Sequence, residues 1–368
     1  MFIWSNLFYC QRDVDKLRIL WLNHRDPLHP KAGGAERTIY EVAKRLIQKG
    51  NEVSLYCPKW EGSMDFEILD GIKIIRSGNN LSIHLILPIF LLKNKYDVII
   101  NDLAHGIPWI TPTILGKKNI VFFRHLHARS LPGQVNFILA KIISFIEKLY
   151  PLLYRNDKIV TESSTSEEDL IGLGFLKENI IRIPPGVDLK LFFPGKKTKN
   201  VQLIYFGGFR KYKRPEFLLT VYEQLNSVVN NLCMVVTGEG KLLERIKQEA
   251  VSKNYNIRFT GKVGQTELAN LIRESWINLH FSVTEGWGLS IIESSASGTP
   301  TIALAAPGVM DTVAENYNGF IVREIDQFRD KILDIIENEE TFAKKSREFA
   351  ERFDWEKTTN LWNELFHD

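Results

Sequence analysis

The amino-acid sequence predicts an α/β protein made of two parallel-sheet domains. Short apolar runs that suit buried strands alternate with segments whose apolar residues recur at helical spacing, and this alternation is typical of parallel sheets. The alternation occurs twice, before and after a turn-rich stretch at residues 184–200. The length of 368 residues is also too great for one ordinary core and suits two domains of roughly 150 to 200 residues each.

The first series begins with an apolar strand at 17–22, a loop that contains Gly33 and Gly34, and a helix from Glu36 to Gly50. Apolar positions in that helix recur at spacings of three and four, and a glycine is a natural stop. Further strands are expected at 53–56, 72–75, 98–100 and 120–123. Together these elements predict a Rossmann-like domain.

The second series repeats this architecture without repeating the sequence. Its strands are expected at 203–206, 234–237, 257–260, 277–280 and 301–304. Near-helical spacing then predicts a terminal helix with the apolar positions Trp355, Leu361, Trp362 and Leu365. We therefore expect an N-terminal extension at 1–16, a first Rossmann-like domain at 17–194, a second at 195–352 and a terminal helix at 353–368.

Composition excludes several classes of protein. The formal charge of +3 comes from 47 basic and 44 acidic residues, which is too even a balance for a nucleic-acid binder. Cys10, Cys57 and Cys233 form no CxxC pair, which argues against a disulfide framework or a zinc cluster and favours a reducing cytoplasm. The longest apolar run, 81–92, is well short of the roughly 18 residues that span a bilayer. Met1 to Cys10 make a poor signal peptide.

One predicted helix raises the question of membrane contact. Between 135 and 150, an otherwise mostly apolar helix carries a narrow polar stripe made of Lys141, Ser144, Glu147 and Lys148. We predict that this helix packs in the core. The alternative is contact with a membrane surface, which would place the protein peripherally on the inner face of the cell membrane.

The segment 283–303 carries the strongest indication of chemistry. Its sequence, VTEGWGLSIIESSASGTPTIA, predicts a strand end, a glycine loop, a short helix from about Leu289, and a strand. The N–H groups of Gly288, Leu289 and Ser290 would then face a ligand above the sheet, with the positive end of the helix dipole behind them. An anionic diphosphate suits that position.

Seven residues separate Glu285 from Glu293, so the first carboxylate lies on the loop and the second in the opening turns of the helix. Both can face one crevice, where carboxylates accept hydrogen bonds from sugar hydroxyls. The alternative for Glu293 is a favourable interaction with the helix dipole and no ligand contact.

A second glycine segment, 205–215, follows the first strand of the second series. It contains four cations, Arg210, Lys211, Lys213 and Arg214. Lysine and arginine can neutralise a diphosphate leaving group without a metal, and a place after a strand favours a binding site over solvated surface. Gly238 and Val263 lie on loops after two further strands, where ligands bind in open α/β sheets.

In combination, these motifs resemble the GT-B fold glycosyltransferases of family 4, also called the glycosyltransferase group 1 family. The hallmark is Glu285, seven residues and Glu293, embedded in EGWGL, IIE and GTP and followed by Gly308, Asp311 and Asn318-Gly319. PKAGGAERTIYEVAKRL and then GNEV resemble the first glycine loop and helix of the family. The resemblance covers nearly the whole chain. It implies two Rossmann-like domains that face each other across a cleft, with a C-terminal helix crossing back to the N-terminal domain.

The resemblance also implies roles for particular residues. Glu285 would contact hydroxyls of the donor sugar, Glu293 the ribose, and Lys213 the diphosphate. Gly33 and Gly34 would lie near the phosphates or the acceptor.

The family pattern has an arginine where this chain has Gly208, and we expect Arg210 to take its place. His125, at the end of a predicted strand, would contact the donor sugar or orient the reacting groups, and His127 would point the same way along that strand. A metal site is the alternative for the two histidines, although two without further ligands rarely form one. Further donor contacts are expected from Gly208, Gly238, Val263, Gly286, Trp287, Gly288 and Leu289.

The function implied is a retaining, metal-independent transfer of a hexose-type sugar from a UDP- or GDP-sugar to a glycan, lipid-linked or small-molecule acceptor. We expect it to require no cofactor beyond the donor and to serve polysaccharide or glycoconjugate biosynthesis. One alternative is a sugar-nucleotide epimerase or phosphorylase on the same fold, and another is a non-catalytic partner subunit. A dehydrogenase is excluded because Gly33-Gly34 lacks the GxGxxG spacing.

Overall fold

The computed structural model describes residues 16–105, 107–109, 111, 118–130 and 136–367. Apart from Lys16, the extension expected at 1–16 lies outside the described residues. Contacts between Cα atoms divide the chain into two compact units. The first comprises 1–102 and 109–120, and the second comprises 103–108 and 121–368.

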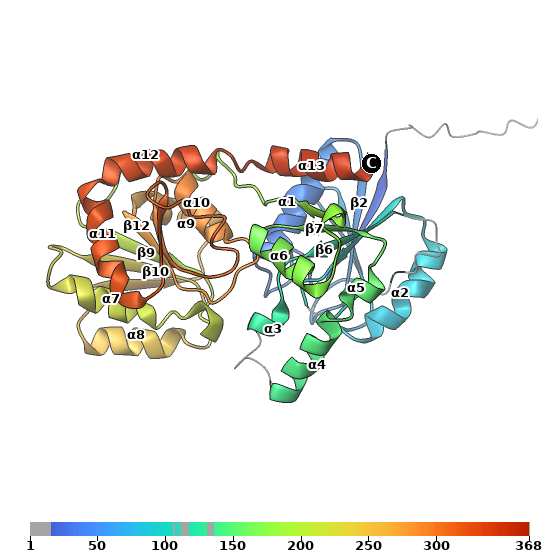
Figure 1. Cartoon of the computed structure of the whole chain (residues 1–368), viewed down its shortest axis with the longest axis horizontal. Helices are drawn as coiled ribbons and strands as arrows, with labels where there is room; N and C mark the ends of the chain where they lie inside the picture. The colour runs from blue at the N-terminus through green and yellow to red at the C-terminus, as the bar shows by residue number, and fades with distance from the viewer. Residues whose placement is uncertain (1–15, 106, 110, 112–117, 131–135, 368) are drawn as a thin grey trace, which may run out of the picture. The chain divides into compact units, whose positions relative to one another are not determined.

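Within the described residues, eight strands form the first sheet in the order β3-β4-β2-β1-β5-β6-β7-β8. Figure 1 labels β2, β6 and β7 of this sheet. They are β1 (Arg18–Leu22), β2 (Glu52–Cys57), β3 (Phe66–Leu69), β4 (Ile72–Arg76), β5 (Val98–Asp102), β6 (Lys118–Phe123), β7 (Lys158–Thr161) and β8 (Ile180–Arg182). β1 pairs in parallel with β2 and β5, whereas β3 pairs antiparallel with β4. The first sheet is therefore mixed.

The helices of this sheet are α1 (Gly34–Gln48), α2 (Ser82–Lys93), α3 (His127–Ser130), α4 (Phe137–Glu147), α5 (Tyr150–Leu153) and α6 (Ser164–Leu173). α1 buries Ile39, Val42, Ala43 and Leu46, which the helical period places on one face. β1 is fully buried from Ile19 to Leu22, because a strand inside a parallel sheet is covered on both faces. The predicted succession of strand, glycine loop and helix is confirmed.

Six described strands form the second sheet, in the order β11-β10-β9-β12-β13-β14, and the neighbouring strands are parallel. They are β9 (Gln202–Phe206), β10 (Cys233–Thr237), β11 (Ile257–Gly261), β12 (Ile277–His280), β13 (Thr301–Leu304) and β14 (Gly319–Val322). The helices that accompany them are α7 (Phe217–Asn226), α8 (Leu243–Ser252), α9 (Gln265–Glu274), α10 (Leu289–Ala296), α11 (Phe328–Glu337) and α12 (Glu339–Ala350).

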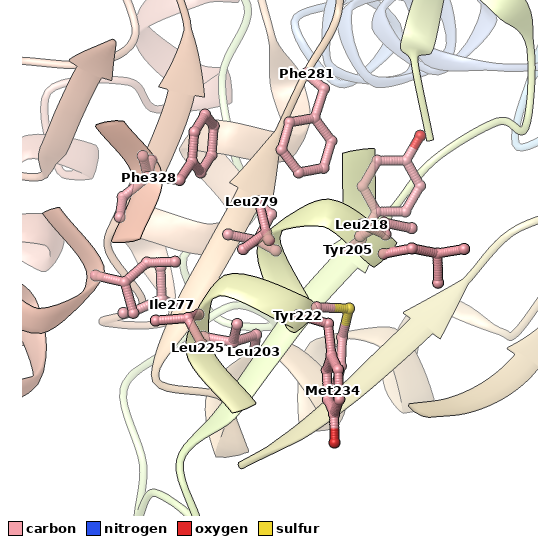
Figure 2. Close-up of a cluster of buried hydrophobic side chains, with 14 of the residues drawn as sticks. Leu203, Tyr205, Leu218, Tyr222, Leu225, Met234, Ile277, Leu279, Phe281 and Phe328 are labelled. Carbon is pink, nitrogen blue, oxygen red and sulfur yellow. The ribbon is translucent and has the colours of Figure 1, made fainter. Parts of the chain in front are cut away.

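One core of the second sheet lies between its strands and the helices α7, α8, α11 and α12 (Figure 2). Leu203 of β9 and Leu279 of β12 pack with Leu218 of α7 and Phe328 of α11, and all four are buried. Burial of such side chains stabilises the fold by roughly 1.5–3 kcal/mol each. This core holds β9 and β12 side by side, and the candidate site is built on the loops that follow them.

The strands predicted at ten positions are confirmed to within a few residues, whereas β3, β7, β8 and β14 were not predicted. Each of these four has only three or four residues, so it offers little pattern. β3 is in addition exposed at Phe66 and Ile68. A strand that is exposed on one face carries no continuous apolar signal.

The helix expected at 135–150 does not pack in the core, so that prediction is wrong. It forms α4 and α5, and along α4 the buried residue is Glu147. Large apolar side chains of α4, such as Phe137 and Ile138, are exposed. The orientation of the helix was wrongly predicted. Glu147 of the polar stripe is buried, whereas large apolar side chains of the same helix are exposed. Among the described helices, none is long and apolar enough to cross a bilayer.

The terminal helix is α13 (Trp355–His367), as predicted. Trp355, Trp362 and Leu365 are buried, but Leu361 is 42% exposed and does not belong to the apolar face. The ring of Trp362 packs edge-on against Phe122 of β6, with centroids 5.1 Å apart. The helix therefore returns from the second sheet to a strand of the first.

Candidate active site

The candidate site lies at the carboxyl edge of the second sheet, on the loops that follow β9 and β12. Lys213 ends a short 3-10 turn, η3 (Lys211–Lys213), and Glu285 lies on the loop after β12. The Lys213 ammonium and the Glu285 carboxylate form an ion pair between these loops. The two residues meet because parallel strands end at the same edge of their sheet. The structure thus brings together two of the residues selected from the sequence.

The surroundings favour the charged form of both partners. Burial alone would raise the pKa of Glu285, but the charge of Lys213 and the contact with His280 hold that pKa well below its usual value. Burial alone would lower the pKa of Lys213, but the charge of Glu285 raises that pKa above its usual value. The carboxylate is therefore ionised and the ammonium protonated throughout the physiological pH range.

His280 is a site residue that the sequence analysis missed. It is the last residue of β12, and its Nε2 lies 3.1 Å from Oε1 of Glu285. The pair with Lys213 uses the same oxygen, so Oε1 contacts both the Lys213 ammonium and the His280 ring. The available signal was a histidine at the end of the strand predicted at 277–280, since functional side chains gather at strand ends.

Arg214 does not belong to the predicted phosphate clamp. Its guanidinium donates to the carbonyl of Phe281 at 2.6 Å and to that of Ser282 at 3.2 Å. It therefore holds the start of the loop that carries Glu285. Arg210 and Lys211 are exposed and lie on the same loop as Lys213.

Two glycines allow loops to approach each other closely at this edge. A Cβ at Gly238 would collide with the carbonyl oxygen of Gly207, and one at Gly308 would collide with that of Glu285. The N–H of Glu285 donates to the carbonyl of Pro307 at 2.9 Å. The backbone of Glu285 is therefore fixed by the neighbouring loop, which requires glycine at 308.

α10 begins at Leu289, as predicted, after Gly288 in the left-handed region with φ of 89°. The positive end of the helix dipole thus lies at the glycine loop. Glu293 is buried on this helix, 5% exposed. Glu293 is therefore not a surface charge beside a helix end, and a buried carboxylate requires polar partners.

Other residues selected as donor contacts differ in what they offer. Trp287 packs edge-on against Phe353, with ring centroids 5.3 Å apart, and is 6% exposed. Leu289 and Val263 pack against the same hydrophobic cluster. These three side chains therefore contribute to the hydrophobic core. Gly208 is partly exposed on the loop after β9.

His125 lies within the second unit beside the glutamate loop. A Cβ added to Gly286 would come within 3.7 Å of its Nδ1. Burial, reinforced by the neighbouring His127, lowers the pKa of His125 to about 3. The ring is therefore neutral at physiological pH and can donate from one nitrogen and accept at the other.

His127 does not continue a strand, and that prediction is wrong. β6 ends at Phe123, and His127 is the first residue of α3. Its Nδ1 lies 3.3 Å from Oε1 of Glu147, and its ring centroid is 5.0 Å from that of His125. The two histidines are neighbours, but His127 is engaged by a carboxylate of α4.

Further polar contacts around this loop were not predicted. Arg124 pairs with Glu162 at 2.7 Å, and both side chains are buried. Asp311 accepts hydrogen bonds from the backbone N–H and the hydroxyl of Ser164, both at 2.9 Å, at the start of α6. A carboxylate at a helix N-terminus is stabilised by the helix dipole. This gives Asp311, one of the motif residues, a structural role.

In the first unit, Gly33 and Gly34 lie where α1 begins. Gly33 precedes the helix, and its N–H donates to Oε2 of Glu36 at 2.6 Å. The carboxylate thereby satisfies an amide that would otherwise be left open at the helix end. The glycine loop is a well-formed helix start.

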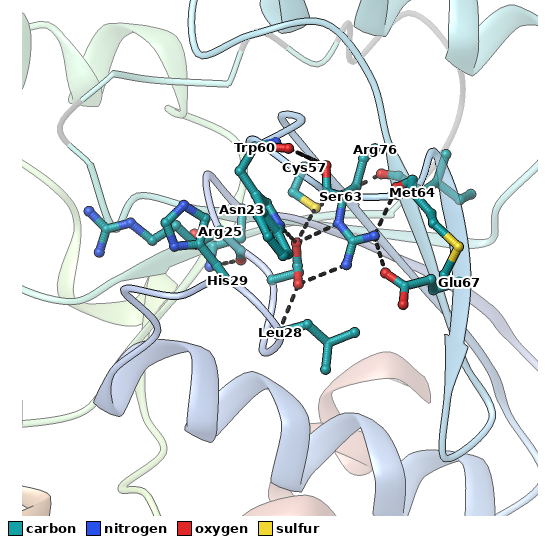
Figure 3. Close-up of polar contacts among 12 residues, drawn as sticks. Asn23, Arg25, Leu28, His29, Cys57, Trp60, Ser63, Met64, Glu67 and Arg76 are labelled. Carbon is teal, nitrogen blue, oxygen red and sulfur yellow. Dashed lines mark hydrogen bonds and ion pairs between the residues drawn. The ribbon is translucent and has the colours of Figure 1, made fainter. Parts of the chain in front are cut away.

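The loop between β1 and α1 is held by a buried ion pair that the sequence did not indicate (Figure 3). Asp26 accepts from Nε and Nη2 of Arg76 at 2.7 and 3.0 Å, and both side chains are completely buried. Asp26 also accepts from the indole N–H of Trp60 at 3.1 Å, and Arg76 pairs in addition with Glu67. The network fixes the loop to β4.

Replacing His280 tests whether it positions Glu285. We expect His280→Leu to lower kcat roughly tenfold, about 1.4 kcal/mol in the activation barrier, because the Glu285 carboxylate loses its contact with Nε2 and is held in place less firmly. His280→Gln retains a donor near the place of Nε2 and should keep most of the activity. Steady-state kinetics and calorimetric nucleotide affinity are the measurements. Equal losses of kcat in the two variants would contradict this role.

The chain matches two family descriptions that together cover most of its length. Residues 32–191 match Glycosyltransferase Family 4, and residues 188–353 match Glycosyl transferases group 1. An uncharacterised glycosyltransferase of Methanocaldococcus jannaschii is 24% identical over 349 residues, which cover 85% of this chain and 96% of the relative.

Solved structures show the same fold. Sucrose-phosphate synthase from Thermosynechococcus elongatus superposes with a TM-score of 0.78 at 21% identity, covering 95% of this chain and 98% of that one. The Anabaena protein HepE in complex with UDP-glucose superposes with a TM-score of 0.70 at 17% identity, covering 95% and 99%. The chain therefore belongs to the GT-B fold glycosyltransferases of family 4, the glycosyltransferase group 1 family.

Proposed function

We propose that this glycosyltransferase moves a hexose-type sugar from a nucleoside diphosphate to its acceptor with retention of configuration. The observation that carries the proposal is the arrangement around Glu285. Lys213 and His280 both approach Oε1, so Oε2 is the oxygen offered to sugar hydroxyls. The adjacent Lys213 ammonium would meet the charge that develops on the diphosphate as the glycosidic bond breaks.

The remaining groups fit around the same donor. The start of α10 would face the diphosphate, with its dipole favouring the anion. Glu293 would accept from the ribose hydroxyls. A neutral His125 would form hydrogen bonds with the sugar without adding a positive charge.

We propose UDP as the first nucleotide to test and GDP as the alternative. Structures of the Anabaena protein in complex with UDP and with UDP-glucose support UDP. A nucleotide that binds the folded protein but not the unfolded chain raises the free energy of unfolding by about 2.7 kcal/mol when its concentration is a hundred times its Kd. We expect UDP or GDP to raise the melting temperature in a thermal-shift assay. If no nucleoside diphosphate shifts melting at millimolar levels, the site is wrongly assigned.

We also propose that transfer needs neither a metal nor any cofactor beyond the donor, because Lys213 and Arg210 supply fixed positive charge. We expect activity to survive EDTA with less than roughly a twofold loss, a change of under about 0.5 kcal/mol in the barrier. The measurement is transfer of labelled sugar with and without chelator. Activity that vanishes in EDTA and returns with manganese would contradict the assignment.

The acceptor is proposed only by class, as a glycan, a lipid-linked molecule or a small molecule. Proton NMR of the first product would distinguish retention from inversion. An α-linked donor gives an α-linked product under retention and a β-linked product under inversion. A sugar-nucleotide epimerase would alter the donor without an acceptor, and a phosphorylase would require phosphate. A non-catalytic subunit would bind nucleotide without turnover.

A further inference from the structure

The segment formed by α4 and α5 exposes large apolar side chains to an unusual extent. Phe137 is 73% exposed, Ile138 72%, Phe145 64% and Leu152 76%. The apolar face, as we call it, consists of Phe137, Ile138, Leu139, Ile142, Phe145, Leu149, Leu152 and Leu153. So many large exposed apolar side chains on one short segment indicate a surface that meets another molecule or a membrane.

The apolar face is not needed to hold α4 in place. Glu147, near the end of α4, is 2% exposed, and its carboxylate accepts the N–H groups of His127 at 2.6 Å and Ala128 at 3.2 Å. Tyr150 is completely buried at the start of α5. The segment is thus anchored at the junction of its two helices, and its apolar side chains are left for another contact.

The charges on this segment have one sign. Lys141, Lys148 and Arg155 are exposed, whereas Glu147, the acidic residue between 136 and 156, is buried. The ammonium of Lys141 lies 4.5 Å from the ring centroid of Phe137. Apolar side chains interleaved with exposed cations are the pattern of a helix that lies in the interface of an anionic bilayer.

We propose that the apolar face docks onto the surface of an anionic lipid bilayer. Phe137, Ile138 and Phe145 would enter the boundary between headgroups and acyl chains. Lys141 and Lys148 would extend to the lipid phosphates, since long basic side chains keep their charged ends at the polar boundary. At 11 residues, α4 is about 16 Å long, which suits a helix lying along the surface.

Charge favours a membrane over a second copy of this chain. A symmetric dimer through the apolar face would bring the same patch of both copies together, and with it two sets of exposed cations. Like charges in such an interface are unfavourable, whereas anionic headgroups supply the opposite sign. The proposal does not depend on the donor, the acceptor or the reaction.

The test uses the full chain and vesicles in a sedimentation assay without nucleotide. One set of vesicles is phosphatidylcholine, and the other contains about 30 mol% phosphatidylglycerol. We expect the protein to bind the anionic vesicles at least roughly tenfold more tightly and to dissociate as salt rises, because surface charges are screened. Weak or equal binding to the two sets would overturn the proposal.

Variants then locate the contact. Phe137→Ser with Phe145→Ser should weaken binding to anionic vesicles at least roughly tenfold, and Lys141→Glu with Lys148→Glu should do the same. The matched control is Val251→Ser with Met310→Ser, which removes apolar side chains that are 67% and 52% exposed elsewhere. This control should bind as the unmodified protein does.

Since all these side chains are exposed, the variants should keep the melting temperature of the unmodified protein. Sedimentation velocity tests the alternative that the apolar face binds a second copy of this chain. A dimer that the Phe137→Ser and Phe145→Ser variant converts to a monomer would assign the face to a second copy and overturn the membrane proposal. Undiminished vesicle binding by that variant would overturn it as well.

Discussion

Glu285→Gln is expected to lower turnover by roughly tenfold to a thousandfold, or about 1.4 to 4 kcal/mol in the activation barrier. Glutamine keeps the size of the side chain but removes its charge and exchanges one acceptor for a donor. The hydroxyls of the sugar would then be held less well in the transition state. The contacts of Oε1 with Lys213 and His280 would weaken at the same time.

In Glu285→Gln, the affinity for the bare nucleotide should not fall together with turnover. In the unmodified protein, the charge of Lys213 is partly offset by Glu285, with which it is paired. Removing the carboxylate leaves the ammonium free to meet the diphosphate. The Kd for UDP or GDP should therefore stay the same or decrease while kcat falls. Initial-rate kinetics and isothermal calorimetry measure the two quantities separately.

Glu293→Gln is the matched control, since it removes the other carboxylate of the motif. If Glu293 holds the ribose, this variant should bind bare UDP or GDP more weakly, because ribose is present in both donor and product. Equal losses of nucleotide affinity in the two variants would show that their roles are wrongly divided. Unchanged turnover in Glu285→Gln would remove that residue from the mechanism.

Much of the fold could be predicted because its central elements carry a strong period. β1 and β9 each contain four consecutive apolar or aromatic residues, β12 is short but fully buried, and α1 repeats its apolar residues at helical spacing. Lys213 and Glu285 could be selected for the same reason, since both follow such strands. Once the sheet is parallel, their meeting at one edge follows from topology.

The features that were missed depend on contacts between distant parts of the chain. Arg214 sits in a run of cations that predicts phosphate binding, but it bonds to carbonyls 67 and 68 residues away. Glu147 lies on what resembles a solvated stripe, yet it turns inward to the N-terminus of α3. Periodicity reports which face is apolar. It does not report whether that face meets the core or something outside the molecule.

The buried pair of Asp26 and Arg76 is another such contact, and breaking it should have the largest effect on stability. We expect Arg76→Met to lower the free energy of unfolding by about 3–5 kcal/mol, because it leaves the Asp26 carboxylate buried without its cation. Adding Asp26→Asn should recover about 1–3 kcal/mol, since the uncompensated charge is then gone. Urea denaturation followed by circular dichroism measures all three proteins.

An exposed ion pair on the same sheet provides the control. Lys73 lies 3.1 Å from Glu52, with side chains that are 46% and 38% exposed. Lys73→Met should therefore cost less than about 1 kcal/mol. If Arg76→Met costs no more than this control, the buried network does not hold the loop between β1 and α1.

The dependence of the free energy of unfolding on pH gives an independent test of the pair formed by Asp26 and Arg76. Burial alone would raise the pKa of Asp26, but the hydrogen bonds and charge of Arg76 lower it below the usual value. The stability that Asp26 contributes is thus present above its unfolded pKa of about 3.9 and is lost as pH falls through the lower folded value. In Arg76→Met the effect of burial is opposed only by the hydrogen bonds from Trp60 and Leu28, so the pKa of Asp26 should rise and protonation should relieve the buried charge. The difference in unfolding free energy between the unmodified protein and Arg76→Met should therefore become smaller from pH 7 towards about pH 4. A difference that stays constant over this range would show that Asp26 is not the group left unpaired.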